Sequence, residues 1–342
     1  MTNISISQSF KSRIGELDFL RGIGILGVIM VHVAQHGIYY SYGNIAVNVI
    51  LDALSRFCVP FFIFVSGVAF SFNYHDQKKY FWRFFLKRLR YIGIPYLLWS
   101  IIGLVRYQIY DVKNIAIVLI TGQAMIHLYF IILIFQFYLL APLILRLFKI
   151  GWKKVLVISF ILNILAFYNF IPLFANLFNG FRNPLFWISY FTAGLIVGMK
   201  IDSFRKHIGK IRLIYLVILW LVIAIISVYN EYDIYNKTSV VQHFFRPTNI
   251  VYSFMSIFLY WKLFDIINTH IRSLLVKLGK YSFGIYLVHI PILFGIHIFT
   301  KPYRGNLLEQ VFAFSICAIA SFIFTFLVSK MKFGVFIVGR AG

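Results

Sequence analysis

Long uninterrupted apolar stretches are the dominant feature of this 342-residue sequence. A helix that crosses the ~30 Å hydrocarbon layer of a bilayer needs about 20 apolar residues. Stretches near or above that length cover residues 20–40, 46–73, 91–110, 122–147, 155–175, 184–200, 212–230, 248–268, 282–300 and 306–329. Because these runs are unbroken rather than alternating, they exclude a transmembrane β-barrel. We therefore predict an all-α, polytopic membrane helix bundle of about ten transmembrane helices.

The connections between these stretches are short and leave no room for a large extramembrane domain. The sequence has no internal repeat, low-complexity tract or Gly/Ser linker, so we predict that residues 1–342 form a single integral-membrane domain. The first apolar run is too long for the core of a signal peptide, and we expect it to remain as a span. Cys58 and Cys317 both lie inside apolar runs, which favours packing roles over a disulfide or a zinc site.

The chain is strongly basic, with 33 Lys and Arg residues against 10 Asp and Glu and a net charge of +23. These cations follow the connections. If the N-terminus is cytoplasmic, the connections on that side, such as 78–90 and 200–212, hold about four times as many Lys and Arg as the opposite ones. This bias predicts that both termini are cytoplasmic. We interpret the basicity as topology, with added contact to anionic membrane lipid, and expect no nucleic-acid partner.

Ionisable residues at membrane depth are costly and therefore informative. In the first span, Asp18 and Arg21 are three residues apart, and Arg21 and His32 are eleven apart, so all three share one helical face. Arginine binds phosphate in pairs of hydrogen bonds, and neutral histidine can accept a proton near pH 7. This face could therefore hold a phosphate-bearing donor. The alternative is an interfacial anchor, Arg21 paired with Asp18, and a histidine that only packs against another helix.

The second span also carries polar residues. Asp52 and Arg56 are four residues apart and are expected to pair, either in support of a site or as a structural pair alone. Ser66, followed by Gly67, is expected to favour close helix packing over substrate contact. The sequence has no HExxH motif, cysteine pair or P-loop, so we expect no metal and no ATP-driven step.

Four motifs in order along the chain resemble the membrane-bound acyltransferase-3 family. They are Leu17-Asp18-Phe19-Leu20-Arg21-Gly22-Ile23-Gly24-Ile25 with His32; Ser55-Arg56, Val59-Pro60-Phe61-Phe62 and Ser66-Gly67; His127-Leu128-Tyr129; and Gly279-Lys280-Tyr281-Ser282 with Tyr286-Leu287-Val288-His289. The departures are Gly24, where the family has Ala, and Tyr129, where it has Trp.

The resemblance implies a bacterial plasma-membrane O-acyltransferase that uses acyl-CoA, either acetyl-CoA or succinyl-CoA, as donor and a surface or lipid-linked glycan as acceptor. Arg21 would hold the CoA phosphates, and His32 would be the catalytic base or a transient acyl carrier. The other residues predicted from it are Lys280, Tyr281, Ser282 and His289 at the donor, His127 and Tyr129 at the acceptor, and Asp18, Asp52, Arg56 and Ser66 in support. For Tyr281 and Ser282 an interfacial belt and a helix cap are the alternative, and for His127 an interfacial histidine.

A transporter is the alternative from another functional class. Residues 90–97 and 283–289 resemble the intercellular-adhesion protein C subgroup of the same family, which has been described both as an exporter and as a succinyltransferase. The resemblance therefore keeps open an exporter of a surface polysaccharide or a lipid-linked sugar. A purely structural or receptor protein would leave the shared face of Arg21 and His32 unexplained.

Overall fold

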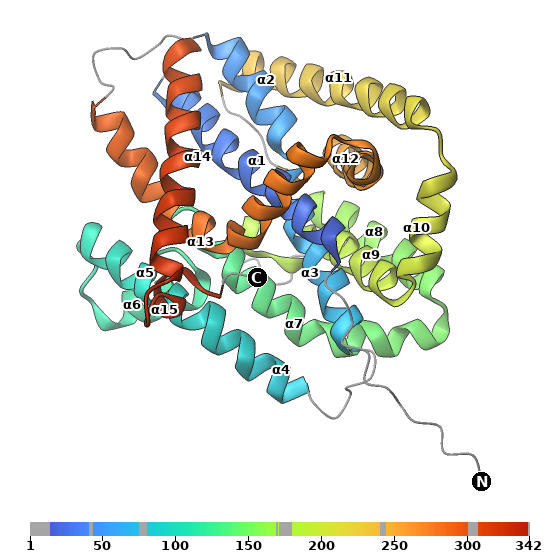
Figure 1. Cartoon of the computed structure of the whole chain (residues 1–342), viewed down its shortest axis with the longest axis horizontal. Helices are drawn as coiled ribbons and strands as arrows, with labels where there is room; N and C mark the ends of the chain where they lie inside the picture. Colours follow the sequence, from blue (N-terminus) through green and yellow to red (C-terminus); the bar gives the residue numbers. More distant parts are fainter. Residues whose placement is uncertain are drawn as a thin grey trace.

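The computed structural model describes residues 14–40, 44–74, 81–168, 170, 180–239, 244–299 and 307–340, and these contain helices and no strand. The α-helices are α1 (Gly15–Tyr39), α2 (Ile45–Ser55), α3 (Cys58–Tyr74), α4 (Phe81–Arg88), α5 (Ile94–Arg106), α6 (Val112–Thr121), α7 (Tyr129–Leu147), α8 (Trp152–Phe167), α9 (Ile188–Met199), α10 (Ile201–Lys210), α11 (Leu213–Thr238), α12 (Pro247–Ile266), α13 (Thr269–Phe299), α14 (Leu307–Ser329) and α15 (Val335–Val338). Short helical turns are η2 (Leu89–Gly93), η3 (Phe148–Ile150), η4 (Gly180–Arg182) and η5 (Pro184–Phe186). The all-α prediction is confirmed (Figure 1).

Each predicted apolar stretch overlaps a helix in its described part, and seven helical segments of the described chain are long and apolar enough to cross a membrane. They are Gly15–Tyr39, Ile45–Phe72, Phe81–Arg106, Tyr129–Ile150, Leu213–Thr238, Thr269–Phe299 and Leu308–Ser329. Three predicted spans are not among these seven: α8 with 16 residues, α9 with 12, and α12, which has 20 residues. At 1.5 Å per residue, α9 is only ~18 Å long. Its residues 189–198 are all buried, so neighbouring helices surround most of its length.

The second predicted stretch is one membrane span made of two helices. The chain turns at Arg56 and Phe57, between α2 and α3, and Pro60 lies in the first turn of α3. A proline has no N–H for the helix ladder and is tolerated best in a first turn. The break therefore falls where the sequence allows it. It also leaves the Arg56 side chain, 2% exposed, inside the bundle.

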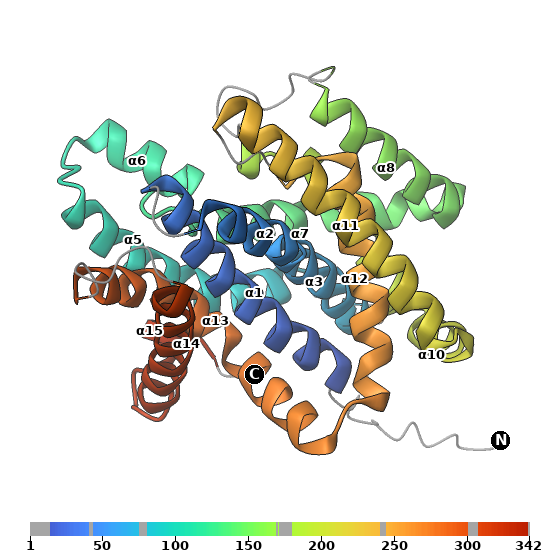
Figure 2. The same cartoon turned by 90° about the horizontal axis from the view of Figure 1, so that it is seen from above.

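Helix α1 lies at the centre of the bundle, where it contacts α2, α3, α12, α13 and α14 (Figure 2). It touches α13 backbone to backbone through two glycines. A Cβ on Gly22 would collide with the Leu275 carbonyl, and a Cβ on Gly279 would collide with the Asp18 carbonyl. Because a side chain fits at neither position, both glycines are needed for the two helices to cross this closely. The crossing places Arg21 and Lys280 at the same end of the bundle. We call that end, where α1 begins at Gly15, the inner end, and the end near Tyr39 the outer end.

A second close crossing joins α3 to α9. A Cβ on Gly67 would lie 3.1 Å from the Gly194 Cα, and a Cβ on Gly194 would collide with the Phe64 carbonyl. The prediction that Ser66-Gly67 permits close packing is therefore confirmed for the glycine. This contact holds α3 in place beside α1, and one face of α3 borders the cavity of the candidate site.

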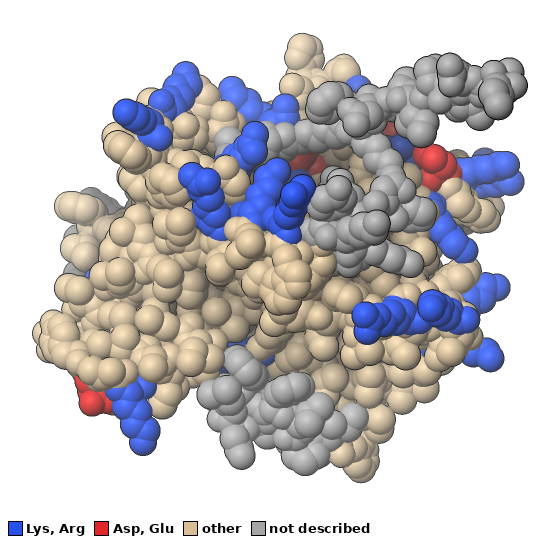
Figure 3. Space-filling view, turned by 90° about the horizontal axis from the view of Figure 1, so that it is seen from below, with Lys and Arg blue, Asp and Glu red and all other residues tan. Residues whose placement is uncertain are grey.

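The short amphipathic helices α4 and α10 are rich in cations. Helix α4 exposes Trp82 and Leu86 beside Arg83 and Lys87. Figure 3 shows Lys and Arg gathered on the face toward which α4 lies, with few acidic side chains. Helix α10 is fixed to the start of α1 by Arg205, whose Nε donates to Glu16 Oε1 over 2.6 Å. This hydrogen bond raises the pKa of Arg205 above its usual value.

The C-terminal segment folds back onto the inner end of the bundle. Trp99 Nε1 of α5 donates a hydrogen bond of 2.9 Å to the Ile337 carbonyl, and Val338 is buried. Contacts of α15 with α5, α13 and α14 complete this docking. Residue Arg340 is thereby held beside α13.

Candidate active site

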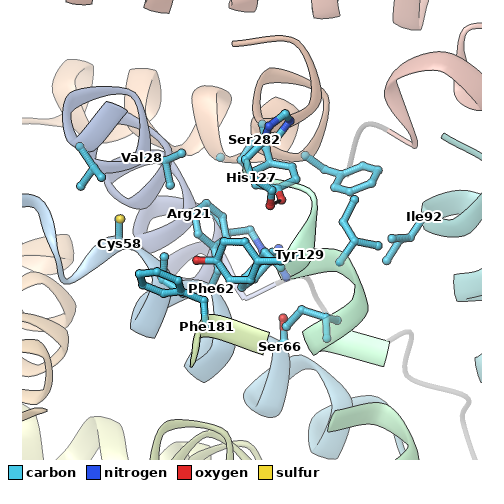
Figure 4. A pocket seen from close by; sticks show the side chains of 18 of the residues that line it. Arg21, Val28, Cys58, Phe62, Ser66, Ile92, His127, Tyr129, Phe181 and Ser282 are labelled. Atoms are coloured by element: carbon cyan, nitrogen blue, oxygen red, sulfur yellow. Dashed lines mark hydrogen bonds between the residues drawn. The ribbon is translucent and has the colours of Figure 1, made fainter. Parts of the chain in front are cut away.

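Side chains from α1, α3, α4, η2, the turn before α7, α7 itself, η4, α13 and the C-terminal segment converge on one cavity of about 320 Å³ (Figure 4). Residues on its wall that matter for chemistry are Arg21, His32, Gln35, Ser66, Arg88, Tyr91, His127, Tyr129, Lys280, Ser282, Tyr286 and Arg340. The volume lies at the lower end of the range for small-ligand pockets. Most of the remaining wall is apolar, formed by residues such as Val28, Phe62 and Ile134.

Arg21 and His32 lie on the same wall of this cavity. They are three turns apart on α1, which corresponds to ~16 Å along the helix axis. Arg21 Nη1 donates to Asp18 Oδ1 over 2.9 Å, while 29% of the Arg21 side chain stays accessible. The predicted Asp18–Arg21 pair and the shared face of Arg21 and His32 are therefore present, and the guanidinium is restrained without being sealed off.

The inner end of the cavity is strongly positive. Arg88, Lys280 and Arg340 line it together with Arg21, and no acidic side chain of the described chain is on the wall. These four cations come from α1, α4, α13 and the C-terminal segment. Such a group of donors matches a ligand that carries several phosphates, because each guanidinium can donate two parallel hydrogen bonds.

Three histidines meet in the middle of the molecule. The ring centroids of His32 and His289 are 5.2 Å apart, and those of His127 and His289 are 5.0 Å apart. His289 is fully buried, and its Nδ1 lies 2.6 Å from the Tyr286 carbonyl. Because a carbonyl only accepts, His289 Nδ1 carries the hydrogen and its Nε2 is left with a lone pair. No hydrogen-bond partner for that Nε2 lies within the described chain.

His127 is held at the cavity by its backbone. The Tyr286 hydroxyl donates to the His127 carbonyl, and the two rings pack edge to face with centroids 5.0 Å apart. The His127 side chain is 2% exposed, yet neither ring nitrogen has a hydrogen-bond partner among the described residues. A buried imidazole without partners is unfavourable unless something else satisfies it. This ring is therefore available to a bound molecule.

Aromatic side chains line the outer end of the cavity. Tyr129 and Phe181 lie 5.6 Å apart, and Phe181 lies 5.7 Å from Phe244, measured between ring centroids. All three line the cavity. Next to Phe181, burial lowers the pKa of the Arg182 guanidinium from its usual value, and the nearby Tyr129 offsets part of this effect.

A buried ion network lies behind this aromatic end. Arg56 Nη2 donates to Asp52 Oδ2 over 2.5 Å, and Arg56 Nη1 lies 2.5 Å from Glu231 Oε1. Both carboxylates and the guanidinium are at most 2% exposed. Arg246 is 3.7 Å from the same Glu231 oxygen, and burial lowers its pKa, an effect that Glu231 opposes. The predicted Asp52–Arg56 pair is therefore present, as part of a larger set.

Comparison with known proteins shows which family the chain belongs to. The family model described as "Acyltransferase domain" of the acyltransferase-3 type matches residues 14–330. The chain belongs to the acyltransferase-3 family. This confirms the resemblance drawn from the four motifs.

Curated members of the acyltransferase-3 family with similar sequences are bacterial. The chain is 24% identical to "Putative membrane-bound acyltransferase YfiQ" of Bacillus subtilis, over 96% of this chain and 95% of that protein. It is 25% identical to a "Probable poly-beta-1,6-N-acetyl-D-glucosamine export protein" of Staphylococcus aureus, over 85% of each chain. No solved structure is significantly similar to it. With its apolar helices, the chain is a multi-pass bacterial membrane protein.

Most of the residues predicted for this acyltransferase-3 site reach the cavity or its second layer. Ser66, Ser282, Lys280, His127 and Tyr129 line the cavity. Of those that do not, Asp18 pairs with Arg21, Asp52 and Arg56 lie behind the outer end, and His289 packs between two histidines. Tyr281 lies apart from the cavity, with its ring 5.6 Å from Phe322 of α14.

The cavity also contains polar residues that the sequence does not mark as site residues. The sequence predicts Arg88 and Arg340 only as topological charges, Tyr91 belongs to the segment 90–97 with its family resemblance, and Gln35 is not singled out. Gln35 had a signal that could have found it: it follows His32 by three residues and so lies on nearly the same helical face. Arg340 had none, because its position depends on a fold-back of the C-terminal segment.

The described residues include no group of three or more His, Cys, Asp or Glu side chains arranged to hold a metal ion. Cys58 lines the cavity and Cys317 contacts the His289 carbonyl at 3.4 Å. Both thiols are buried and unpaired. The polar groups on the cavity wall are imidazoles, hydroxyls, guanidinium groups, the Lys280 ammonium and the Gln35 amide.

Proposed function

We propose that the protein is a membrane O-acyltransferase that moves an acetyl or succinyl group from cytoplasmic acyl-CoA to a hydroxyl of a cell-surface or lipid-linked glycan. One observation carries the proposal: a single cavity joins a cluster of four cations to His32. Family membership supports acyl transfer as the reaction class. The acyl donor and the acceptor are the proposed parts.

Acyl-CoA fits the shape and charge of the inner half of this cavity. Its head carries several phosphates, which Arg21, Arg88, Lys280 and Arg340 would hold. Its pantetheine arm is long, thin and mostly uncharged, which matches the apolar stretch beside Val28 and Phe62. The ~16 Å between Arg21 and His32 along α1 would then place the thioester near the imidazole.

His32 would act as the general base. The acceptor hydroxyl donates its proton to the neutral imidazole while its oxygen attacks the thioester carbonyl carbon. The carbon–sulfur bond then breaks, the CoA thiolate takes the proton back from His32, and the ester and free CoA leave. His289 would orient the His32 ring from behind, and His127 and Tyr129 would hydrogen-bond the acceptor. A route in which His32 itself carries the acyl group is the variant of this mechanism.

Polysaccharide export is a second candidate, because a similar Staphylococcus aureus protein is named for it. A cavity of about 320 Å³ holds a narrow arm rather than a passing polymer, which favours transfer. The two functions predict different phenotypes in a strain that lacks the gene. Loss of an acyltransferase removes ester groups from the surface glycan, whereas loss of an exporter leaves the polymer trapped inside the cell with its esters unchanged.

The direct test uses the purified protein with acetyl-CoA and succinyl-CoA. We expect calorimetry in detergent to detect binding of at least one of them, and His32→Ala to bind it while acyl transfer in membranes falls by about 10²–10⁴-fold. His270→Ala, which changes an exposed histidine outside the cavity, should leave transfer unchanged. Near-normal transfer by His32→Ala would refute the assignment.

A further inference from the structure

We propose that Gln35 binds the acceptor: its side-chain oxygen accepts a hydrogen bond from a second hydroxyl, next to the one that is acylated. This inference rests on the proposed function, since it concerns the acceptor of that reaction. Gln35 lies one turn beyond His32 toward the outer end, and both side chains line the cavity. An acceptor whose reacting hydroxyl faces His32 would place its neighbouring groups beside Gln35.

The orientation of the Gln35 amide is fixed by its contact with Asp52. Gln35 Nε2 donates to Asp52 Oδ1 over 3.1 Å. An ionised carboxylate can only accept hydrogen bonds, so the amide nitrogen must face Asp52 and the amide oxygen must point away from it. That oxygen has no hydrogen-bond partner in the described part of the chain. The Gln35 side-chain oxygen is therefore a hydrogen-bond acceptor beside the cavity, to which a ligand can donate.

Asp52 is in turn held in place by Arg56. The guanidinium donates to Asp52 Oδ2 through Nε over 2.8 Å and through Nη2 over 2.5 Å. Oδ2 is therefore occupied, and Oδ1 remains for Gln35. Because Asp52 is fully buried, its carboxylate has no water to turn toward. Asp52 thus acts as a positioning residue that decides which end of the Gln35 amide meets the acceptor.

The charge around Gln35 indicates the class of acceptor. Arg56 and Arg246 balance Asp52 and Glu231 in the network behind it, so this part of the wall is close to neutral. Neutral surroundings offer no opposite charge to a charged acceptor, and a hydroxyl is a sufficient donor for the amide oxygen. We therefore infer an uncharged sugar residue with a free hydroxyl adjacent to the acylated one.

Gln35→Met tests the binding role, because methionine keeps the length of the side chain and removes its hydrogen-bonding groups. In a deletion strain that expresses the variant, we expect the acyl ester content of the surface carbohydrate, measured by mass spectrometry, to fall about tenfold. The affinity of the purified variant for the acyl-CoA that the wild type binds should stay within about twofold. Gln136→Met, at an intramembrane glutamine of α7 away from the cavity, is the matched control and should retain wild-type ester content.

Exchanging the amide and the carboxylate between positions 35 and 52 tests the orientation of the Gln35 amide. In Asp52→Asn the new amide should turn its oxygen to Arg56 and its nitrogen to Gln35, which forces the Gln35 amide to present nitrogen to the cavity. We expect ester content to fall about tenfold. In the double variant Gln35→Glu with Asp52→Asn, the amide nitrogen introduced at position 52 donates to the carboxylate introduced at position 35, and an accepting oxygen faces the cavity again. Ester content should recover at least threefold over that of the single variant, at equal protein level in the membrane.

The outcomes separate this inference from the function on which it rests. If wild-type protein binds neither acyl-CoA, or if deletion of the gene leaves the ester content unchanged, the proposed function is wrong and this inference falls with it. If those tests succeed but Gln35→Met retains full ester content, only the role of Gln35 is wrong. If Gln35→Met lowers the ester content but the double variant shows no recovery over Asp52→Asn, then Asp52 does not orient the Gln35 amide.

Discussion

At the scale of single residues, Arg56 is a cation enclosed by two carboxylates within the bundle. Asp52 and Glu231 both contact it at 2.5 Å, and all three side chains are buried. Removing one partner of such a group leaves charge behind without compensation, which costs far more than the net value of the contact. The network therefore fixes the outer half of α1, α2 and α11 relative to one another.

We expect Arg56→Met to destabilise the protein by about 3–5 kcal/mol. The reason is that Asp52 and Glu231 would then face each other across an apolar side chain. Lys237→Ala is the matched control, because it breaks an ion pair with Asp233 on α11 whose side chains are 70% and 41% exposed, and exposed pairs contribute little to stability. Thermal unfolding in detergent measures both. Equal midpoints for the two variants would contradict a stabilising role for the buried network.

Arg340 provides a prediction for donor binding. Its guanidinium lines the inner end of the cavity although it belongs to the C-terminal segment. We expect Arg340→Ala to weaken acyl-CoA binding about three- to tenfold, since an exposed Arg–phosphate contact is screened by solvent and salt. The difference between variant and wild type should shrink at high ionic strength. Lys332→Ala, an exposed cation of the same segment outside the cavity, should bind acyl-CoA like the wild type; the same loss in both would point to bulk charge instead.

The residues that sequence analysis placed together are those linked by the geometry of one helix. The spacings Asp18–Arg21, Arg21–His32 and Asp52–Arg56 follow from ~3.6 residues per turn, and the structure shows these neighbours. Helical periodicity gives no such rule for contacts between segments that are distant in the sequence. Nothing in the sequence ties Arg340 to Arg21, or Glu231 to Arg56, because tertiary packing alone brings them together.

At the scale of helices, the crossing of α1 and α13 decides whether the cation cluster forms. Gly22 and Gly279 let the two backbones touch, and this contact sets Arg21 beside Lys280. In the sequence, Gly279 is recognisable only as the first residue of a family motif. Its physical role is a close approach that a side chain would prevent.

We expect Gly279→Ala to destabilise the protein by about 1–3 kcal/mol and to weaken acyl-CoA binding, because the added methyl group meets the Asp18 carbonyl and pushes α13 away from α1. Gly295→Ala is the control on the same helix, where a Cβ would meet nothing within 4 Å. That change should be neutral or slightly stabilising, since alanine is the better helix former. Thermal unfolding and calorimetry of both proteins make the comparison. A neutral Gly279→Ala would mean that the two helices are not in contact there.

The helices could be predicted because the apolar runs are long. The breaks and ends of helices within these runs were harder to predict. The run 46–73 reads as one span, yet it is α2 and α3 with a turn at Arg56 and Phe57. The run 184–200 reads as a span, yet α9 is 12 residues long and buried among its neighbours. Hydropathy reports that a segment avoids water. It does not report whether other helices or lipid surround that segment.

At the scale of the whole molecule, the cavity reaches from the cation-rich inner end to the aromatic outer end. The wall includes Arg340 and Lys280 at one extreme and Phe181 and Phe244 at the other. Both proposed substrates could therefore reach His32 from opposite sides of the membrane. The positive-inside bias of the connections predicts that the cation-rich end faces the cytoplasm.

This arrangement predicts a sidedness that membrane vesicles can measure. Acyl-CoA is charged and does not cross a bilayer, so labelled acyl-CoA added outside should be used only by vesicles whose cytoplasmic face is outward. We expect inside-out vesicles to incorporate label into glycan, and right-side-out vesicles to do so only after the membrane is made permeable. The His32→Ala protein should show no incorporation in either orientation, which separates enzyme-dependent transfer from background. Equal incorporation by intact vesicles of both orientations would mean that the donor does not enter at the cation-rich end alone, and the division of the cavity into a donor half and an acceptor half would be wrong.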